Sequence, residues 1–319
     1  MPPETPPAPT PHGACRIAAV VVTFNRLEHI RKTLERLDME GIDHVVVVDN
    51  GSTDGTREWL ETQRSPRCDV LLTEGNLGGA GGFARGMAHA RDHVGAEWTV
   101  LMDDDGRPAP GALARFRQHD WQTADAVAAA VFYPDGRICD MNRPLRNPFA
   151  KGRRQRGFRI DDAAYDAGAP SLPIDMATFV GLFLSRRALE AMDGPDPRLF
   201  IYGDDLIHTL RLSQAGCRIV FAPSIRFEHD CATMSDATKT YRPLWKVYYH
   251  HRNGILLYRQ AAGPLSWGLL ALRAPKWWLA GRHYGADAPE YRRLLRKALA
   301  DGILRRLDDP PPGIPGPPR

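Results

Sequence analysis

Short runs of almost wholly apolar residues alternate with helix-forming segments along the first third of the chain. The runs cover residues 17–23, 44–49 and 70–73. Each is predicted to be a buried strand, because strands that are covered on both faces are continuously apolar. Between the first two runs, Ile30, Leu34 and Leu37 recur at the i, i+4, i+7 spacing of a helix. Strands that alternate with helices predict an α/β fold with a doubly wound, mostly parallel sheet.

A fourth apolar run, residues 98–102, ends in three consecutive carboxylates, Asp103, Asp104 and Asp105. Open α/β sheets bind their ligands at the carboxyl ends of the strands. Alternate residues of an extended segment share a face, so Asp103 and Asp105 can both reach one ion. Oxygen ligands of this kind favour Mg²⁺ or Mn²⁺, usually completed by substrate phosphates. Taken alone, the three acids fit a solvated acidic turn equally well.

Residues 76–83 form a glycine-rich loop that leads into a predicted helix. Its glycines allow the backbone to approach a ligand closely, and the N-terminus of the helix favours a negatively charged group. The loop lacks the GxGxxG pattern of dinucleotide-binding folds and the GK[ST] of P-loops. It is therefore either a ligand-binding loop of another kind or an ordinary turn.

The second half of the chain adds two candidate sites. Asp204 and Asp205 stand just before a predicted helix, where one would cap the helix and the other is a candidate general base. His229 ends a strand, where an imidazole is either structural or a third ligand beside the carboxylates. Ser185 is expected to cap the helix that follows it. Further apolar runs cover residues 126–133, 176–184, 217–223 and 225–229.

Composition and charge narrow the class of protein without naming a partner. The chain has 319 residues, 43% of them hydrophobic and 25% charged, which is typical of a globular protein. A net charge of +4 is too small to name a partner by itself. The 5 cysteines include no CxxC pair, which favours a reducing compartment over a disulfide framework or a zinc knuckle. The N-terminal region lacks the apolar core of a signal peptide, and no apolar run reaches the length of a membrane span.

Changes in composition divide the chain into four segments. Residues 1–15 are a Pro-rich tail that is expected to be disordered, and residues 310–319 form a second Pro-rich tail. The α/β pattern occupies residues 16–232. Residues 233–309 carry 14 Lys and Arg against 6 Asp and Glu, together with several Trp and Tyr. This last segment is predicted to be helical, and its residues suit either a membrane surface or ordinary packing with solvated basic faces.

Six motifs, taken in their order along the chain, resemble one known family. They are VVVTFNR at 20–26, VDNGSTD at 48–54, NLGGAGGF at 76–83, MDDD at 102–105, FIYGDD at 200–205 and EH at 228–229. Together they resemble the inverting, family-2-type glycosyltransferases of GT-A fold. The glycine-rich and triple-Asp motifs are most similar to those of bacterial galactofuranosyltransferases, with rhamnosyltransferases next.

The resemblance implies roles for particular residues. The nucleotide-sugar donor would be bound by Arg26, Asn50, Asn76, Asp103 and Asp104. A divalent metal, Mn²⁺ or Mg²⁺, would be held by Asp103, Asp105 and His229. Asp205 would be the catalytic base.

The resemblance also implies partners and a location. The donor would be UDP-galactofuranose, with dTDP-rhamnose as the alternative, and the acceptor a glycan or a lipid-linked saccharide in cell-envelope polysaccharide synthesis. A nucleotide-sugar-binding protein without catalysis is the alternative outside enzymes, although the intact acids at 103–105 and 204–205 argue against it. The expected location is the cytoplasm, with peripheral contact to the anionic inner face of the cell membrane. Nucleic acid is not an expected partner.

Overall fold

One sheet of nine strands organises the part of the chain that the computed structural model describes, residues 15–150, 158–231, 240–308 and 310–316. The strands are β1 Ile17–Thr23, β2 His44–Asp49, β3 Cys68–Leu72, β4 Trp98–Asp103, β5 Gly106–Pro108, β6 Ala126–Phe132, β7 Leu172–Ile174, β8 Leu182–Ser185 and β9 Ile219–His229. Their spatial order is β3-β2-β1-β4-β8-β6-β9-β5, and β7 also pairs with β9. The pairings make β5, β7 and β8 antiparallel to the other strands. The sheet is therefore mostly parallel, as the sequence predicts.

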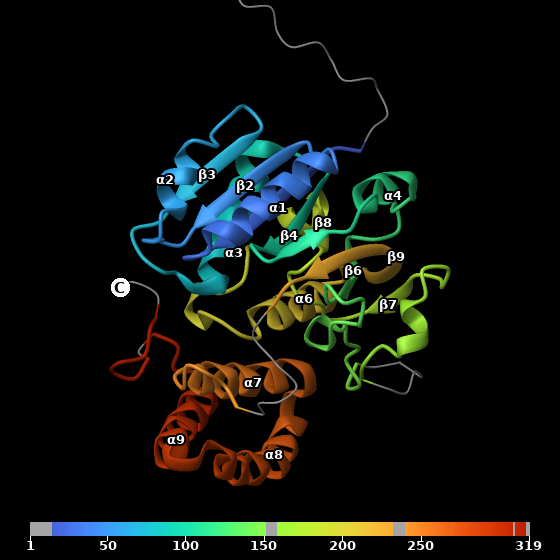
Figure 1. Cartoon of the computed structure of the whole chain (residues 1–319). Helices are drawn as coiled ribbons and strands as arrows, with labels where there is room; N and C mark the ends of the chain where they lie inside the picture. Colours follow the sequence, from blue (N-terminus) through green and yellow to red (C-terminus); the bar gives the residue numbers. More distant parts are fainter. Residues whose placement is uncertain (1–14, 151–157, 232–239, 309, 317–319) are drawn as a thin grey trace, which may run out of the picture.

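Helices cover both faces of this sheet (Figure 1). They are α1 Leu27–Met39, α2 Thr56–Glu61, α3 Gly78–His89, α4 Ala112–Gln118, α5 Arg186–Ala191 and α6 Asp204–Gln214. Ala19 and Val21 of β1 belong to a buried cluster with residues of α1 and α4. Val20 and Val22, which point to the opposite face, belong to a second cluster with residues of α3, α5 and α6. Two buried faces explain why the strands are continuously apolar, and they confirm the doubly wound fold.

Several element boundaries differ from the sequence-based expectation. The apolar run 176–184 is a strand only over Leu182–Ser185, and the runs 217–223 and 225–229 are one strand, β9. Ser185 caps α5 as expected, since its side chain accepts a hydrogen bond from Ala188 N–H. The expected Asp cap of α6 is wrong: the capping position is held by Gly203, at a φ of 77°, and both acids lie in the first turn. A left-handed backbone at this position favours glycine.

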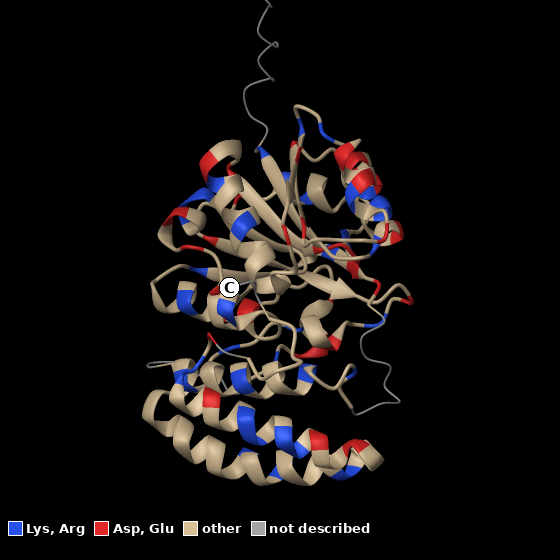
Figure 2. Ribbon diagram, turned by 90° about the vertical axis from the view of Figure 1, so that its left-hand side faces the viewer, with Lys and Arg blue, Asp and Glu red and all other residues tan. Residues whose placement is uncertain are grey.

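Three further helices, α7 Lys246–Ala262, α8 Ser266–Ala280 and α9 Ala288–Leu304, lie together on the side of the sheet where α6 packs (Figure 1). Phe200, from the loop before α6, joins a buried cluster with Val247, Tyr249 and Leu295 of α7 and α9. The described part of the C-terminal segment is thus largely helical, and it packs directly against the loop that leads into α6, whose first turn carries Asp205. Lys and Arg residues, blue in Figure 2, are distributed along these helices at the bottom of that view.

Some expectations fall outside the described residues. The predicted boundary between residues 232 and 233 lies there, as do all but the last residue of the segment 1–15 and part of the segment 310–319. Among the helices that are described, none has the length and apolar character needed to cross a membrane.

Candidate active site

The three predicted metal ligands lie together at one edge of the sheet. Asp103 ends β4, and the chain turns at once into the short strand β5, whose Gly106 pairs with His229 at the end of β9. The Asp230 N–H also donates to the carbonyl of Asp105, at 2.9 Å. Ligand atoms of Asp103, Asp105 and His229 all lie within 4.8 Å of one another. Two carboxylates and one imidazole form a donor set that fits Mn²⁺ or Mg²⁺.

The imidazole of His229 is held on both sides. Its Nε2 lies 3.1 Å from an Asp105 carboxylate oxygen, and its Nδ1 lies 2.7 Å from the Asn142 side-chain oxygen. Burial opposes the charged form of His229, but the contacts with Asp105 and Cys231 together outweigh it and raise the pKa of His229 to about 10. Burial likewise acts to raise the pKa of Asp105, and the contacts with His229 and Arg26 lower it overall. His229 and Asp105 therefore form an ion pair at this edge of the sheet.

The other acids of the triple-Asp motif are less stable as anions. Burial, and then the charge of Asp105, raise the pKa of Asp103 to about 7. Burial raises the pKa of Asp104 to about 6, although the Arg26 guanidinium acts against this. The buried Asp104 carboxylate accepts a hydrogen bond from the Thr23 hydroxyl at 2.7 Å. A cluster of buried carboxylates with raised pKa values is typical of a functional site, because a cation or a substrate relieves the repulsion.

The other predicted donor-binding residues, Arg26, Asn50 and Asn76, follow the carboxyl ends of the neighbouring strands β1, β2 and β3. Arg26 Nη1 lies 3.3 Å from Asp104 and also contacts Asp105. Asn50 donates from its amide to the Gly78 carbonyl at 3.0 Å, and Asn76 accepts from the Gly78 N–H at 2.7 Å. The side-chain oxygen of Asn50 is buried without a hydrogen-bond partner among the described residues. An unsatisfied buried oxygen beside a glycine-rich loop is where a ligand would donate a hydrogen bond.

Asp204 and Asp205 face the same site from the first turn of α6. Burial raises the pKa of Asp205 to about 6, and its carboxylate accepts the Leu206 N–H at 2.7 Å. Burial and the charge of Asp205 raise the pKa of Asp204 well above its ordinary value. The charge of Asp205 also acts on Asp103, so the two groups are within electrostatic range of each other. A carboxylate with a pKa of about 6 is suited to accept a proton near neutral pH.

The loop before α6 is held by a residue that sequence reasoning missed. Phe200 and Tyr202 both have a φ of 64°, which costs a residue other than glycine on the order of 1–2 kcal/mol. Asn253 of α7 donates from its amide to the carbonyls of Leu199, Ile201 and Tyr202, at 2.9, 2.9 and 2.8 Å. The neighbouring Arg252, fully buried, donates to the carbonyl of Leu199 at 3.2 Å. An Asn within a helical pattern gives no sign that it will fix a loop some fifty residues earlier.

Comparison with known proteins identifies the family. The profile described as Glycosyl transferase family 2 matches residues 18–180. Galactofuranosyltransferase GlfT1 of Mycobacterium tuberculosis is 33% identical over 224 residues, covering 68% of this chain and 71% of that protein. The N-acetylglucosaminyl-diphospho-decaprenol L-rhamnosyltransferase of the same organism is 26% identical over 294 residues, covering 81% and 91%.

Solved structures support the fold. The mannosyltransferase PcManGT from Pyrobaculum calidifontis, described in complex with GDP-Man and Mn²⁺, matches with a TM-score of 0.54 and 19% identity. The match covers 94% of this chain and 90% of that one. The chain therefore belongs to glycosyl transferase family 2 and is a glycosyltransferase with the GT-A fold.

Proposed function

We propose that this protein is a metal-dependent, inverting galactofuranosyltransferase that uses UDP-galactofuranose. The observation that carries the proposal is the convergence of Asp103, Asp105 and His229 at one edge of the sheet, within electrostatic range of Asp205. The relatives named galactofuranosyltransferases support this donor sugar.

The proposed donor site consists of Arg26, Asn50, Asn76, Asp103 and Asp104. Arg26 pairs with the carboxylates of Asp104 and Asp105. A cation held by Asp103, Asp105 and His229 would take over that pairing and free the guanidinium for the diphosphate, a group that arginine binds well. The unpartnered oxygen of Asn50 would accept a hydrogen bond from the nucleotide.

The proposed mechanism is a single displacement. When bound, a divalent cation neutralises the charge that develops on the leaving diphosphate. Asp205 accepts the proton of the acceptor hydroxyl as that oxygen attacks the anomeric carbon from the face opposite the leaving group. One such attack inverts the configuration, and no side chain needs to act as a nucleophile.

A panel of nucleotide sugars tests the donor. With divalent metal present, UDP-galactofuranose should be hydrolysed or transferred faster than any other sugar nucleotide. Transfer from dTDP-rhamnose alone would show that the proposed donor is wrong, but it would not contradict the proposed mechanism. The rhamnosyltransferase relative makes dTDP-rhamnose the second candidate donor. Tight donor binding without any turnover would instead indicate a nucleotide-sugar-binding protein.

We further propose that the acceptor is lipid-linked and that α8 rests on the anionic inner surface of the cell membrane. The large apolar residues exposed along or beside α8 are Leu265, Trp267, Leu272, Trp278 and Leu279. The guanidinium of Arg259 lies over the ring of Trp267, at 5.5 Å, and that of Arg292 lies over Trp278, at 5.4 Å. Exposed Trp and Leu beside cations suit the boundary between acyl chains and anionic headgroups. Residues 16–232 would then provide catalysis and residues 233–309 attachment.

A matched pair of variants tests this attachment. Leu272 of α8 is 69% exposed and Met39 of α1 is 73% exposed, so neither substitution removes a buried contact. Leu272→Asp should weaken sedimentation with vesicles containing anionic lipid, whereas Met39→Asp should leave it unchanged. The binding should also fall with rising salt, since each Lys or Arg near the surface contributes about 1 kcal/mol at low ionic strength. If the unaltered protein ignores anionic vesicles at low salt, the attachment is excluded.

A further inference from the structure

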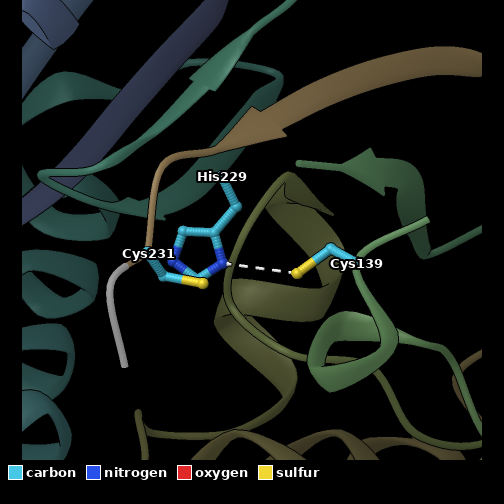
Figure 3. A group of neighbouring side chains, drawn as sticks. All are labelled: Cys139, His229 and Cys231. Carbon is cyan, nitrogen blue, oxygen red and sulfur yellow. Dashed lines mark hydrogen bonds between the residues drawn. The ribbon is translucent and has the colours of Figure 1, made fainter. Parts of the chain in front are cut away.

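The imidazole of His229 lies between two different sets of metal-binding groups. Its Nε2 faces the Asp105 carboxylate. Its Nδ1 faces the Asn142 side-chain oxygen at 2.7 Å and the Cys139 thiol at 3.9 Å (Figure 3). Figure 3 also shows the thiol of Cys231 beside the ring, on the chain that continues from β9.

This second set consists of soft ligands. Ligand atoms of Cys139, His229 and Cys231 all lie within 4.8 Å of one another. Both cysteines are free thiols, and Cys231 Sγ lies 3.3 Å from the thioether sulfur of Met141. Cys139 is buried, but Cys231 is half-buried and Met141 is 37% exposed, so an ion can enter from solvent. Thiolate, thioether and imidazole ligands select thiophilic ions such as Zn²⁺ over Mg²⁺ or Mn²⁺.

We propose that Cys139, Cys231 and Nδ1 of His229 form a binding site for a thiophilic ion such as Zn²⁺, and that its occupation opposes metal binding at Asp103 and Asp105. The inference rests on the proposed catalytic role of the metal site at Asp103 and Asp105. Tetrahedral zinc with ordinary bond lengths separates its ligand atoms by roughly 3.6 Å. The distance of 3.9 Å between Cys139 Sγ and His229 Nδ1 already approaches this value. On binding, each thiol releases its proton to solvent, Nδ1 of the protonated His229 releases a third, and Met141 or water completes the coordination.

The opposition between the two sites follows from the chemistry of imidazole. A neutral imidazole offers one lone pair, so an ion on Nε2 requires the proton on Nδ1, and an ion on Nδ1 requires it on Nε2. Asn142 favours the first arrangement, because its oxygen accepts a hydrogen bond from Nδ1–H. The Asn142 amide is itself fixed by donating to the Thr178 hydroxyl at 2.8 Å. An ion at the thiols must displace this hydrogen bond. It also leaves the proton on Nε2, so His229 can no longer bind an ion held by Asp103 and Asp105.

Cadmium titration of the reduced, metal-free protein tests the site without measuring catalysis. Cd²⁺ bound to thiolates gives an ultraviolet charge-transfer band, which should saturate at one ion per chain. Cys231→Ser, at a half-buried position that should tolerate the change, should reduce the band and weaken binding on the order of tenfold or more. Cys68→Ser, at another half-buried free thiol, is the matched control and should behave as the unaltered protein. Absence of the band, or its full retention in Cys231→Ser, would overturn the proposal.

Competition between ions tests the coupling. Saturating Mn²⁺ should weaken Cd²⁺ binding by a factor on the order of ten, and by linkage Cd²⁺ should weaken Mn²⁺ binding equally. In Asp103→Ala, which lacks a carboxylate ligand, the cadmium band should persist and Mn²⁺ should no longer affect it. Cadmium binding that Mn²⁺ leaves unchanged in the unaltered protein would refute the coupling. Neither measurement uses a sugar donor, so the outcome for the thiol site does not depend on whether the proposed transferase activity is found.

Discussion

Gly78, the first residue of α3, packs against the loop that leads into α6 and Asp205, and an added methyl group should disturb both segments. Gly78 has a φ of +70°, and a Cβ built there would lie 2.2 Å from the Phe200 carbonyl oxygen and 2.6 Å from its ring. The same carbonyl accepts the Ala80 N–H at 3.0 Å. In Gly78→Ala the backbone around Phe200 must therefore move by about 1 Å, because overpacked backbone atoms cannot yield as flexible side chains do.

Two contributions add up in the loss of stability that Gly78→Ala should cause. A left-handed alanine costs about 1–2 kcal/mol, and overpacking of this kind costs roughly 1–3 kcal/mol more. A total of about 3 kcal/mol lowers the melting temperature of a protein of this size by roughly 5–10 °C. A shift of about 1 Å in a catalytic group reduces turnover on the order of 10²-fold. Calorimetry and steady-state transfer assays measure the two effects.

Gly79→Ala is the control for this experiment. Gly79 is the next residue of α3, but its φ is not in the left-handed region, and the nearest atom to an added Cβ is an Asp204 oxygen at 3.8 Å. Alanine inside α3 should stabilise the protein by roughly 0.5–1 kcal/mol. If Gly78→Ala has the melting temperature and turnover rate of the unaltered protein, the close packing of Gly78 against Phe200 does not position Asp205.

Three further results are expected. Asp205→Asn should retain donor affinity while its transfer rate falls on the order of 10²–10⁴-fold. The unaltered enzyme should lose transfer activity as the pH falls below about 6, where Asp205 is protonated. An unchanged transfer rate in Asp205→Asn would exclude Asp205 as the base. Because the folded-state pKa of Asp103 is raised to about 7, its contribution to stability is full below about pH 4 and is lost as the pH rises through about 7. Saturating Mn²⁺ should therefore raise the melting temperature more at about pH 8 than at about pH 5, and excess chelator should reverse the increase. An equal increase in melting temperature at the two pH values would contradict this reasoning. Asn253→Ala removes the hydrogen bonds to three carbonyls and should cost about 2–3 kcal/mol of unfolding free energy in denaturant titration, with a larger loss in transfer rate than in donor affinity.

The candidate site was largely accessible from sequence, because its groups lie in short motifs. Asp103 and Asp105 follow an apolar strand, and that position alone places them at the ligand-binding edge of an α/β sheet. Asp205 was a candidate because it stands at the start of a predicted helix and matches the family resemblance, although its neighbour's expected capping role was wrong. Capping depends on the backbone angles of Gly203, which local composition does not specify.

Other contributors could not be found from sequence, because they act across long separations. Asn253 stabilises strained backbone at Tyr202 from a helix whose own pattern only indicates burial. Asn142 lies in an irregular segment, yet its oxygen orients the ring of His229. The thiols of Cys139 and Cys231 are far apart in the chain and match no cysteine motif, so only folding makes them neighbours.

The sequence by itself determined the layered α/β fold and the edge of the sheet where the candidate site lies, because apolar periodicity and strand ends are local properties. Only the tertiary structure decided that His229 meets Asp105. That contact depends on the three-residue strand β5, which pairs antiparallel with the end of β9 and sets Gly106 opposite His229. A strand this short has too few residues for a recognisable pattern, and its pairing is selected by the packing of the whole sheet.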